Sequence, residues 1–200
     1  MQNILYIASK SKSRKKLLQE ARIPFEVLEQ DADENQCDWS LPLQDLVTSI
    51  AHCKMEHVIM PTGTQGQIAF VVTADTLSID PTGKIRGKPI DQQEAIEMLQ
   101  AAGLGVNICG TAFCLEKKVF ANNSWTTQEK IVGYAQAFYE FQIPDSWISD
   151  YLKTTNALEA AGAIKIEDGK QFVKSINGSY SAIIGLPMFE LREALIQIGF

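Results

Sequence analysis

The sequence predicts an α/β protein in which helices flank a mixed β-sheet. Short apolar runs typical of buried strands alternate with amphipathic segments of helical spacing, and the two kinds intermix along the whole chain. The chain has 200 residues, of which 46% are hydrophobic and 21% are charged, as in ordinary globular proteins. No linker, repeat or low-complexity stretch divides it. We therefore expect a single domain over residues 1–200.

Apolar runs and helical spacing locate the elements of the first half. Strands are expected at Ile4–Ala8, at Phe25–Leu28 and at Ile68–Thr73, the last of which ends at Ala74-Asp75-Thr76. Helices are expected around Leu17 to Ala21, from Leu43 to Ile59, and up to Ala102 with Asp91 as the N-cap.

Strand-forming residues dominate the middle of the chain. Three segments are β-branched or aromatic and partly alternating, which predicts antiparallel strands at Ile108–Leu115, Val119–Trp125 and Glu129–Phe141. A helix is then expected from Pro144 to Lys153, a strand at Phe172–Ile176 and a last helix at Leu186–Ile198.

Composition disfavours several classes of protein. A net charge of −6 argues against a general binder of nucleic acid or acidic membranes. No apolar stretch approaches the ~20 residues that a membrane span requires, and the N-terminus shows no secretory signal. The four cysteines form no C-x-x-C pair, which favours free, mostly buried thiols over structural zinc. We expect a cytoplasmic protein.

A basic turn is the first candidate site. Residues 10–16 are Lys-Ser-Lys-Ser-Arg-Lys-Lys and lie between the first predicted strand and the first predicted helix. Cations at a helix N-terminus oppose the helix dipole unless an anion completes the site. Backbone N–H groups, serine hydroxyls and an arginine suit a phosphate, and the alternative is a solvated basic helix face. The chain contains neither a P-loop nor a dinucleotide-binding glycine motif.

Three more residues are candidates for chemistry. Lys54 lies on the apolar stripe of its helix, so it faces a cleft or extends past the edge of the stripe to solvent. Asp75 directly follows a buried strand, where α/β sheets place ligands, although an aspartate there can also be a cap or turn residue. Lys88, between Gly87 and Pro89, is on a short loop that either aims it or exposes it.

Six short segments, spread over nearly the whole chain, carry a family resemblance. They are Ile7-Ala8-Ser9-x-Ser11-x-x-Arg14-x-x-Leu17-Leu18; Pro24-Phe25-Glu26-Val27 with Asp31-x-Asp33-Glu34; Ala51-x-x-Lys54; Ala74-Asp75-Thr76; Gly87-Lys88-Pro89 with Glu94-Ala95; and Gly178-Ser179-Tyr180-Ser181 through Gly185-Leu186-Pro187. In this order and spacing they resemble the Maf family of nucleotide pyrophosphatases.

The resemblance implies a cytoplasmic nucleoside triphosphate pyrophosphatase related in fold to the inosine triphosphatases, with two lobes around a cleft. Such enzymes cleave between the α and β phosphates with a divalent metal, Mg²⁺ or Mn²⁺. Asp75 would accept the proton of the attacking water and ligate the metal together with Glu34. The triphosphate would be bound by Ser9, Ser11, Arg14, Lys54 and Lys88. A homodimer is also typical of the family.

Three positions bear on which base is preferred: Ser13, Thr76 and Glu167. Where the family often has Ser-Pro-Arg-Arg, this chain has Ser-Lys-Ser-Arg, with Ser13 in place of the first arginine. Glu167 replaces a common glutamine and resembles the subfamily associated with 7-methyl-GTP, whereas Thr76 resembles the dTTP/UTP subfamily. A carboxylate suits a cationic methylated guanine, and a glutamine can offer donor and acceptor to a pyrimidine. The sequence does not decide which nucleotide base is preferred.

Two rival functions remain. The departures at Ser13 and Glu167 favour a non-catalytic nucleotide-binding protein that acts through a partner in cell division. The retained Arg14, Lys54, Asp75 and Lys88 count against it. An RNA-binding role is disfavoured by the acidic net charge and by the lack of a spread basic and aromatic surface.

Overall fold

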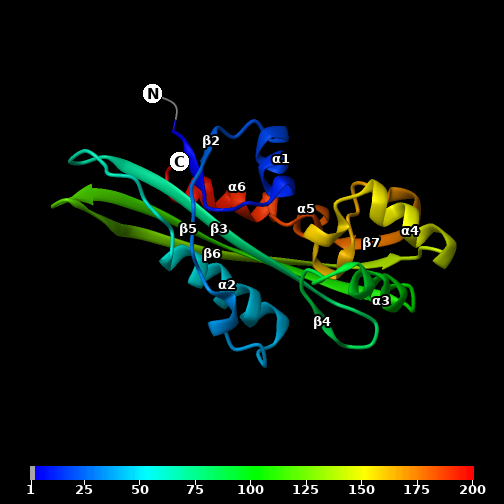
Figure 1. The fold of residues 1–200 in the computed structure, drawn as a ribbon. Coiled ribbons are helices and arrows are strands. Elements are labelled where there is room, and N and C mark those ends of the chain that lie inside the picture. The colour runs from blue at the N-terminus through cyan, green and yellow to red at the C-terminus, as the bar shows by residue number, and fades with distance from the viewer. Residues whose placement is uncertain (1–2) are drawn as a thin grey trace.

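One mixed β-sheet of seven strands forms the centre of the computed structural model, which describes residues 3–200 (Figure 1). The strands are β1 (Leu5–Ile7), β2 (Phe25–Val27), β3 (Ile68–Ile79), β4 (Ile85–Arg86), β5 (Val106–Ala121), β6 (Ser124–Phe141) and β7 (Val173–Gly178). Their order is β2-β1-β3-β5-β6-β7, with β4 paired to β3. Strand β1 is parallel to β2 and β3, and the other pairs are antiparallel. The predicted mixed α/β class is confirmed.

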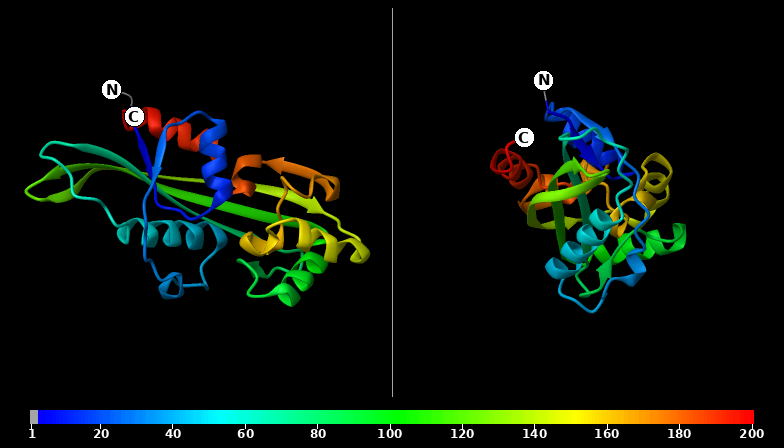
Figure 2. Two further views of the ribbon diagram at one scale, coloured as in Figure 1. Left: turned by 45° about the horizontal axis from the view of Figure 1, so that its top comes forward. Right: turned by 90° about the vertical axis from the view of Figure 1, so that its left-hand side faces the viewer.

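Helices cover both faces of this sheet, as the two views in Figure 2 show. They are α1 (Lys12–Glu20), α2 (Leu43–Glu56), α3 (Gln92–Ala102), α4 (Asp145–Thr154), α5 (Tyr180–Ile184) and α6 (Met188–Gln197). Helices α1 and α6 pack on the β3 face that carries Phe70 and Val72, and α2 packs on the opposite face against Leu77 and Ala112. None of the described helices is long and apolar enough to cross a membrane.

The hairpin of β5 and β6 corrects one predicted strand. The expected strand at Val119–Trp125 is wrong, because this segment crosses the turn between β5 and β6. The turn residues Asn122 and Asn123 have φ of 52° and 59°. Asparagine tolerates this left-handed conformation, which a two-residue hairpin turn requires at both positions. The strands expected on either side therefore become longer and join directly.

Two helix boundaries also differ from the sequence prediction. The helix expected to reach Ile59 ends at Glu56, because Val58 leaves the helix and forms a β-bridge with Gln30. The last helix begins at Met188, and the short helix α5 before it was not expected. Helix α3 is confirmed, with the Asp91 carboxylate accepting a hydrogen bond from the Glu94 backbone N–H at 2.8 Å.

Strand β3 is longer than predicted, and this changes the setting of Asp75. The apolar run ends at Thr73, but β5 pairs with β3 over its full length to Ile79, so the strand continues through Asp75. On the other edge, β1 ends opposite Val72, and pairing with β4 extends only from Ser78 to Ile79. Among the described residues, the β3 segment between these two pairs therefore has a partner strand on one edge only.

Candidate active site

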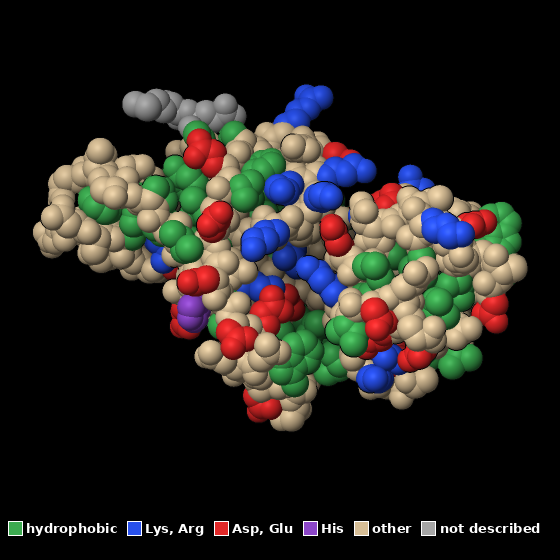
Figure 3. Space-filling view, in the orientation of Figure 1, with side chains coloured by type: hydrophobic (Ala, Val, Ile, Leu, Met, Phe, Trp, Pro, Cys, Tyr) green, Lys and Arg blue, Asp and Glu red, His purple; other side chains and the backbone are tan. Residues whose placement is uncertain are grey.

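A cavity of about 580 Å³ lies over this open edge of β3. Its charged lining consists of six basic and four acidic side chains: Lys10, Lys12, Arg14, Lys54, Lys88, Lys165, Glu34, Asp75, Glu159 and Glu167. Figure 3 shows basic side chains gathered in the hollow at the centre of this face. The volume is in the range of small-molecule sites. A basic excess in a protein of net charge −6 favours an anionic ligand.

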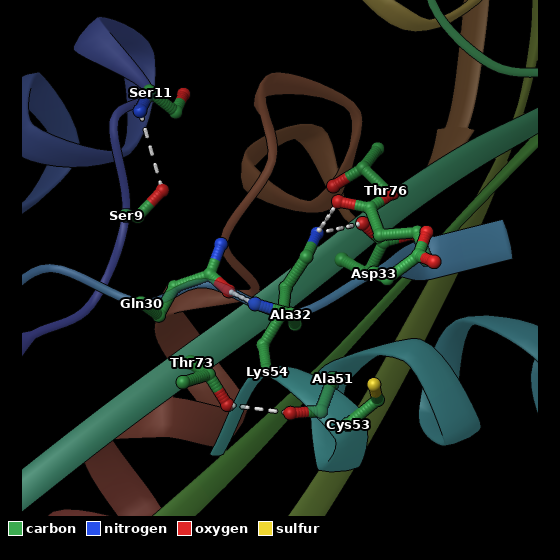
Figure 4. Close-up of polar contacts among 12 residues, drawn as sticks. Ser9, Ser11, Gln30, Ala32, Asp33, Ala51, Cys53, Lys54, Thr73 and Thr76 are labelled. Carbon is green, nitrogen blue, oxygen red and sulfur yellow. Dashed lines mark hydrogen bonds and ion pairs between the residues drawn. The ribbon is translucent and has the colours of Figure 1, made fainter. Parts of the chain in front are cut away.

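Lys54 and Asp75 form a buried ion pair at the base of the cavity. Lys54 is 7% exposed and Asp75 is 6% exposed. The Lys54 ammonium donates to Asp75 Oδ1 at 2.5 Å and lies 2.9 Å from Glu34 Oε1. In Figure 4 the Lys54 side chain extends from α2 toward Thr76. The prediction that Lys54 faces inward is confirmed, since Lys54 reaches the cavity rather than solvent.

The second carboxylate oxygen of Asp75 is unusual. Asp75 Oδ2 is buried and has no hydrogen-bond partner in the described part of the chain. Buried polar atoms without a partner are rare, because each loses its hydration without compensation. Asp75 Oδ2 is therefore free to accept a proton or to coordinate a cation.

The basic turn holds the N-terminus of α1 at the mouth of the cavity. Ser11 is the N-cap and its hydroxyl accepts a hydrogen bond from the Arg14 N–H at 3.3 Å. Ser9 Oγ accepts from the Ser11 N–H at 3.2 Å (Figure 4). The sequence correctly placed Ser9, Ser11 and Arg14 in a strand-to-helix turn. Ser11 and Arg14 line the cavity together with Lys54, whereas Ser9 lies behind them and binds both through its hydroxyl.

Arg14 binds only neutral acceptors. Its Nε donates to the Gly185 carbonyl at 2.6 Å, and its two terminal nitrogens donate to Thr76 Oγ1 at 3.0 Å and to Ser9 Oγ at 3.3 Å. Burial lowers the pKa of Arg14, and the Asp75 and Glu34 carboxylates counteract this. An added anion would therefore stabilise the guanidinium charge.

Gly185 permits this approach to Arg14. Its φ is 125°, a conformation that favours glycine. A Cβ on Gly185 would lie 3.4 Å from Arg14 Nε and 3.5 Å from Thr76 Oγ1. Any side chain here would strain the backbone and crowd the guanidinium.

Ser13 and Glu167 meet at another part of the cavity wall. The Ser13 hydroxyl donates to Glu167 Oε1 at 3.1 Å, although the two residues are 154 positions apart. Lys165 and Glu159 line the same cavity. Of the three predicted specificity positions, the structure brings Ser13 and Glu167 together, whereas the Thr76 hydroxyl binds Arg14.

Lys88 extends into the cavity from the loop after β4. The loop is fixed by a buried ion pair in which Arg86 Nε donates to Asp80 Oδ2 at 2.7 Å. The Gly87 carbonyl next to Lys88 accepts a hydrogen bond from the Gly162 N–H at 2.9 Å. Lys88 is exposed and forms no ion pair with a described residue. The rigid loop therefore aims a free ammonium at the cavity.

The predicted setting of Asp75 at the end of its strand is wrong, although Asp75 does line the cavity. Asp75 does not follow the carboxyl end of its own strand; it lies within β3, three residues beyond the residue that pairs with the end of β1. The neighbouring parallel strand β1 does end at this level of the sheet, so the carboxyl end at which α/β sheets bind ligands is that of β1. An apolar run cannot indicate this, because the continuation of β3 depends on pairing with β5.

Sequence reasoning missed several lining residues. Trp39 is held by its indole N–H, which donates to the Glu34 carbonyl at 3.2 Å, and no motif marks it. Cys109 also lines the cavity, and burial raises the pKa of its thiol to about 12. The thiol is therefore protonated at neutral pH and cannot act as a nucleophile. All four cysteines are free, as expected, but only Cys109 and Cys114 are buried.

Comparison with known proteins identifies the family. The profile described as Maf-like protein matches residues 4–198. A dTTP/UTP pyrophosphatase of Geotalea uraniireducens is 32% identical over 98% of this chain and 95% of its own length. A nucleoside triphosphate pyrophosphatase of Nostoc punctiforme is 33% identical over 97% and 93%, and a dTTP/UTP pyrophosphatase of Caldicellulosiruptor saccharolyticus is 27% identical over 97% and 94%. The chain belongs to the Maf family.

Proposed function

We propose that this protein hydrolyses nucleoside triphosphates to the monophosphate and pyrophosphate. The observation that carries the proposal is the cavity over the edge of β3. There, Asp75, whose Oδ2 has no described partner, lines the same cavity as Arg14 and Lys88, which form no ion pair with a described residue. A polyphosphate supplies the negative charge that these cations lack. The relatives, which are named dTTP/UTP or nucleoside triphosphate pyrophosphatases, support the same reaction.

In this reaction Asp75 Oδ2 accepts the proton of the water that attacks the α phosphorus. The oxygen has no donor to release first, and Oδ1 is held by Lys54, which fixes the carboxylate plane. Arg14, Lys54 and Lys88 bind the phosphate oxygens and stabilise the charge that develops as pyrophosphate departs. Hydrogen bonds and ion pairs fix Arg14 and Lys54 before substrate binds, so these two side chains need little reorganisation.

A divalent cation fits the carboxylates that are present. No group of three or more potential ligands occurs among residues 3–200. However, Mg²⁺ typically takes one or two carboxylates together with water and substrate phosphates. Asp75 and half-exposed Glu34 are the carboxylates that would hold Mg²⁺ or Mn²⁺. When bound, the cation would neutralise phosphate charge.

Thymine and uracil nucleotides are the substrates we propose first. Several relatives are named dTTP/UTP pyrophosphatases. Glu167 is an acceptor on the cavity wall, and thymine and uracil each present one N–H donor on their pairing edge. A guanine that carries a 7-methyl group is cationic and also presents N–H donors, so 7-methyl-GTP is the contrasting substrate.

The test is a measurement of pyrophosphate and phosphate release from dTTP, UTP, CTP, GTP, ITP and 7-methyl-GTP, each with Mg²⁺ or Mn²⁺. We expect equimolar monophosphate and pyrophosphate, fastest from dTTP or UTP. A preference for 7-methyl-GTP would overturn the choice of base alone. If nucleotide raises the melting temperature but is not hydrolysed, the protein is a nucleotide-binding protein and not an enzyme.

A further inference from the structure

Behind Arg14 lies a buried chain of hydroxyl groups. Thr76 Oγ1, which accepts from Arg14, lies 2.9 Å from Thr111 Oγ1. Thr111 is on β5, is 0% exposed and is not part of the cavity lining. Its hydroxyl is 2.7 Å from the carbonyl of Ala182 in α5. These hydrogen bonds thus connect α1, β3, β5 and α5.

The number of protons fixes the direction of every bond in this chain. A threonine hydroxyl has one proton, a carbonyl oxygen only accepts, and a guanidinium only donates. Thr111 therefore donates to the Ala182 carbonyl, and its oxygen accepts the proton of Thr76. The Gly185 carbonyl, 3.5 Å from Thr76 Oγ1, is a poor alternative acceptor at that distance. The Thr76 oxygen is then left with its lone pairs toward Arg14.

From this geometry we infer that Thr111 is a positioning residue for Arg14, acting through Thr76. The inference deepens the proposed function, because Arg14 is one of the groups assigned to the phosphates. It also changes the role expected for Thr76, whose hydroxyl is engaged at both its proton and its oxygen. Thr76 therefore orients a phosphate ligand, and its hydroxyl proton is not available to the base.

The variant that tests this is Thr111→Val, which keeps the shape of the side chain and removes the hydroxyl. Without its acceptor, the Thr76 proton turns to another group and the bond to Arg14 is weakened. We expect affinity for inorganic pyrophosphate, measured by calorimetry with Mg²⁺, to fall about tenfold. The kcat/KM for dTTP should fall by a similar factor, and Thr111→Ser should restore both.

Thr73→Val is the matched control. Thr73 is also 0% exposed on the same sheet, and its hydroxyl donates to the Ala51 carbonyl at 2.7 Å (Figure 4). It contacts neither Thr76 nor Arg14 through that hydroxyl. It should lose stability comparably to Thr111→Val and keep wild-type pyrophosphate affinity.

Three results would overturn the inference. The first is wild-type pyrophosphate affinity in Thr111→Val, and the second is an equal loss in Thr73→Val. The third is a further tenfold loss when Thr111→Val is added to Arg14→Ala, since Thr111 should have no effect once Arg14 is absent. Binding requires no turnover, so an inactive wild-type protein that binds pyrophosphate would contradict the proposed function while the variants still decide this inference.

Discussion

Replacing Lys54 by Met should destabilise the protein strongly. Lys54 is the single hydrogen-bond partner of the Asp75 carboxylate among the described residues, and both side chains are more than nine-tenths buried. Methionine fills a similar volume along the lysine stem, so packing changes little. The variant leaves a buried carboxylate with neither a counter-charge nor a donor. Glu34, whose side chain is 45% exposed, remains hydrated and adds little to the cost.

The expected loss of stability follows from leaving the buried Asp75 carboxylate without its partner. Removing one partner of a buried ion pair costs about 3–5 kcal/mol. For a chain of this size each kcal/mol lowers the melting temperature by roughly 2–4 °C, so Tm should fall by about 6–20 °C. Urea unfolding without nucleotide or divalent metal measures the free energy directly. Adding Asp75→Asn should recover more than half of the loss, because the unpaired charge is then gone.

Lys174→Met is the control for the loss of a lysine charge. Lys174 pairs with Glu140 at 2.8 Å, but its side chain is 59% exposed, so its removal should cost less than about 1 kcal/mol. The reasoning is refuted if Lys54→Met unfolds within about 1 kcal/mol of the wild type. It is refuted equally if the double variant with Asp75→Asn is less stable than Lys54→Met alone.

Two other variants test the contact of Glu167 with the base and the loop that carries Lys88. Glu167→Gln retains an acceptor for the Ser13 hydroxyl, so the stability of the protein should not change. The ratio of kcat/KM for dTTP to kcat/KM for 7-methyl-GTP should rise. An unchanged substrate ranking would show that Glu167 does not contact the base. At Asp80, burial alone would raise the carboxyl pKa, but hydrogen bonds from Thr82, Arg86 and the Lys84 N–H outweigh it and hold the pKa below its ordinary value of 3.8. Ionised Asp80 therefore stabilises the folded state above pH 3.8, and this stabilisation is lost as the pH falls below that value. Asp80→Asn should lower the free energy of unfolding at pH 7, and by progressively less below pH 3.8. A loss that does not change with pH would contradict this assignment.

Local patterns in the sequence were sufficient for most of the fold. Helix α3 follows from the Asp91 cap and its apolar spacing, and the turn before α1 follows from the end of an apolar run before a polar segment. The hairpin turn at Asn122–Asn123 was missed because strand-forming residues continue on both sides without a glycine. The extension of β3 was missed because it depends on a strand about forty residues away.

Sequence reasoning named several residues that line the cavity, but not how they contact one another. Family resemblance indicated Arg14, Lys54 and Asp75, and the inward position of Lys54 also followed from the apolar stripe of α2. Contacts between distant segments could not be predicted in this way. The bond of Ser13 to Glu167 and that of Arg14 to the Gly185 carbonyl each join residues more than 150 positions apart, and a single sequence contains no periodicity that records such pairs.

The most direct test of the proposed function compares Asp75→Asn with the wild type on the preferred triphosphate. If Asp75 Oδ2 accepts the proton of the attacking water, kcat for pyrophosphate release should fall by about 10²–10⁴-fold. The nucleotide should still bind, since the proposed phosphate ligands Arg14 and Lys88 are intact. Wild-type turnover in Asp75→Asn, with the same substrate and metal, would contradict the assignment of Asp75 as the base.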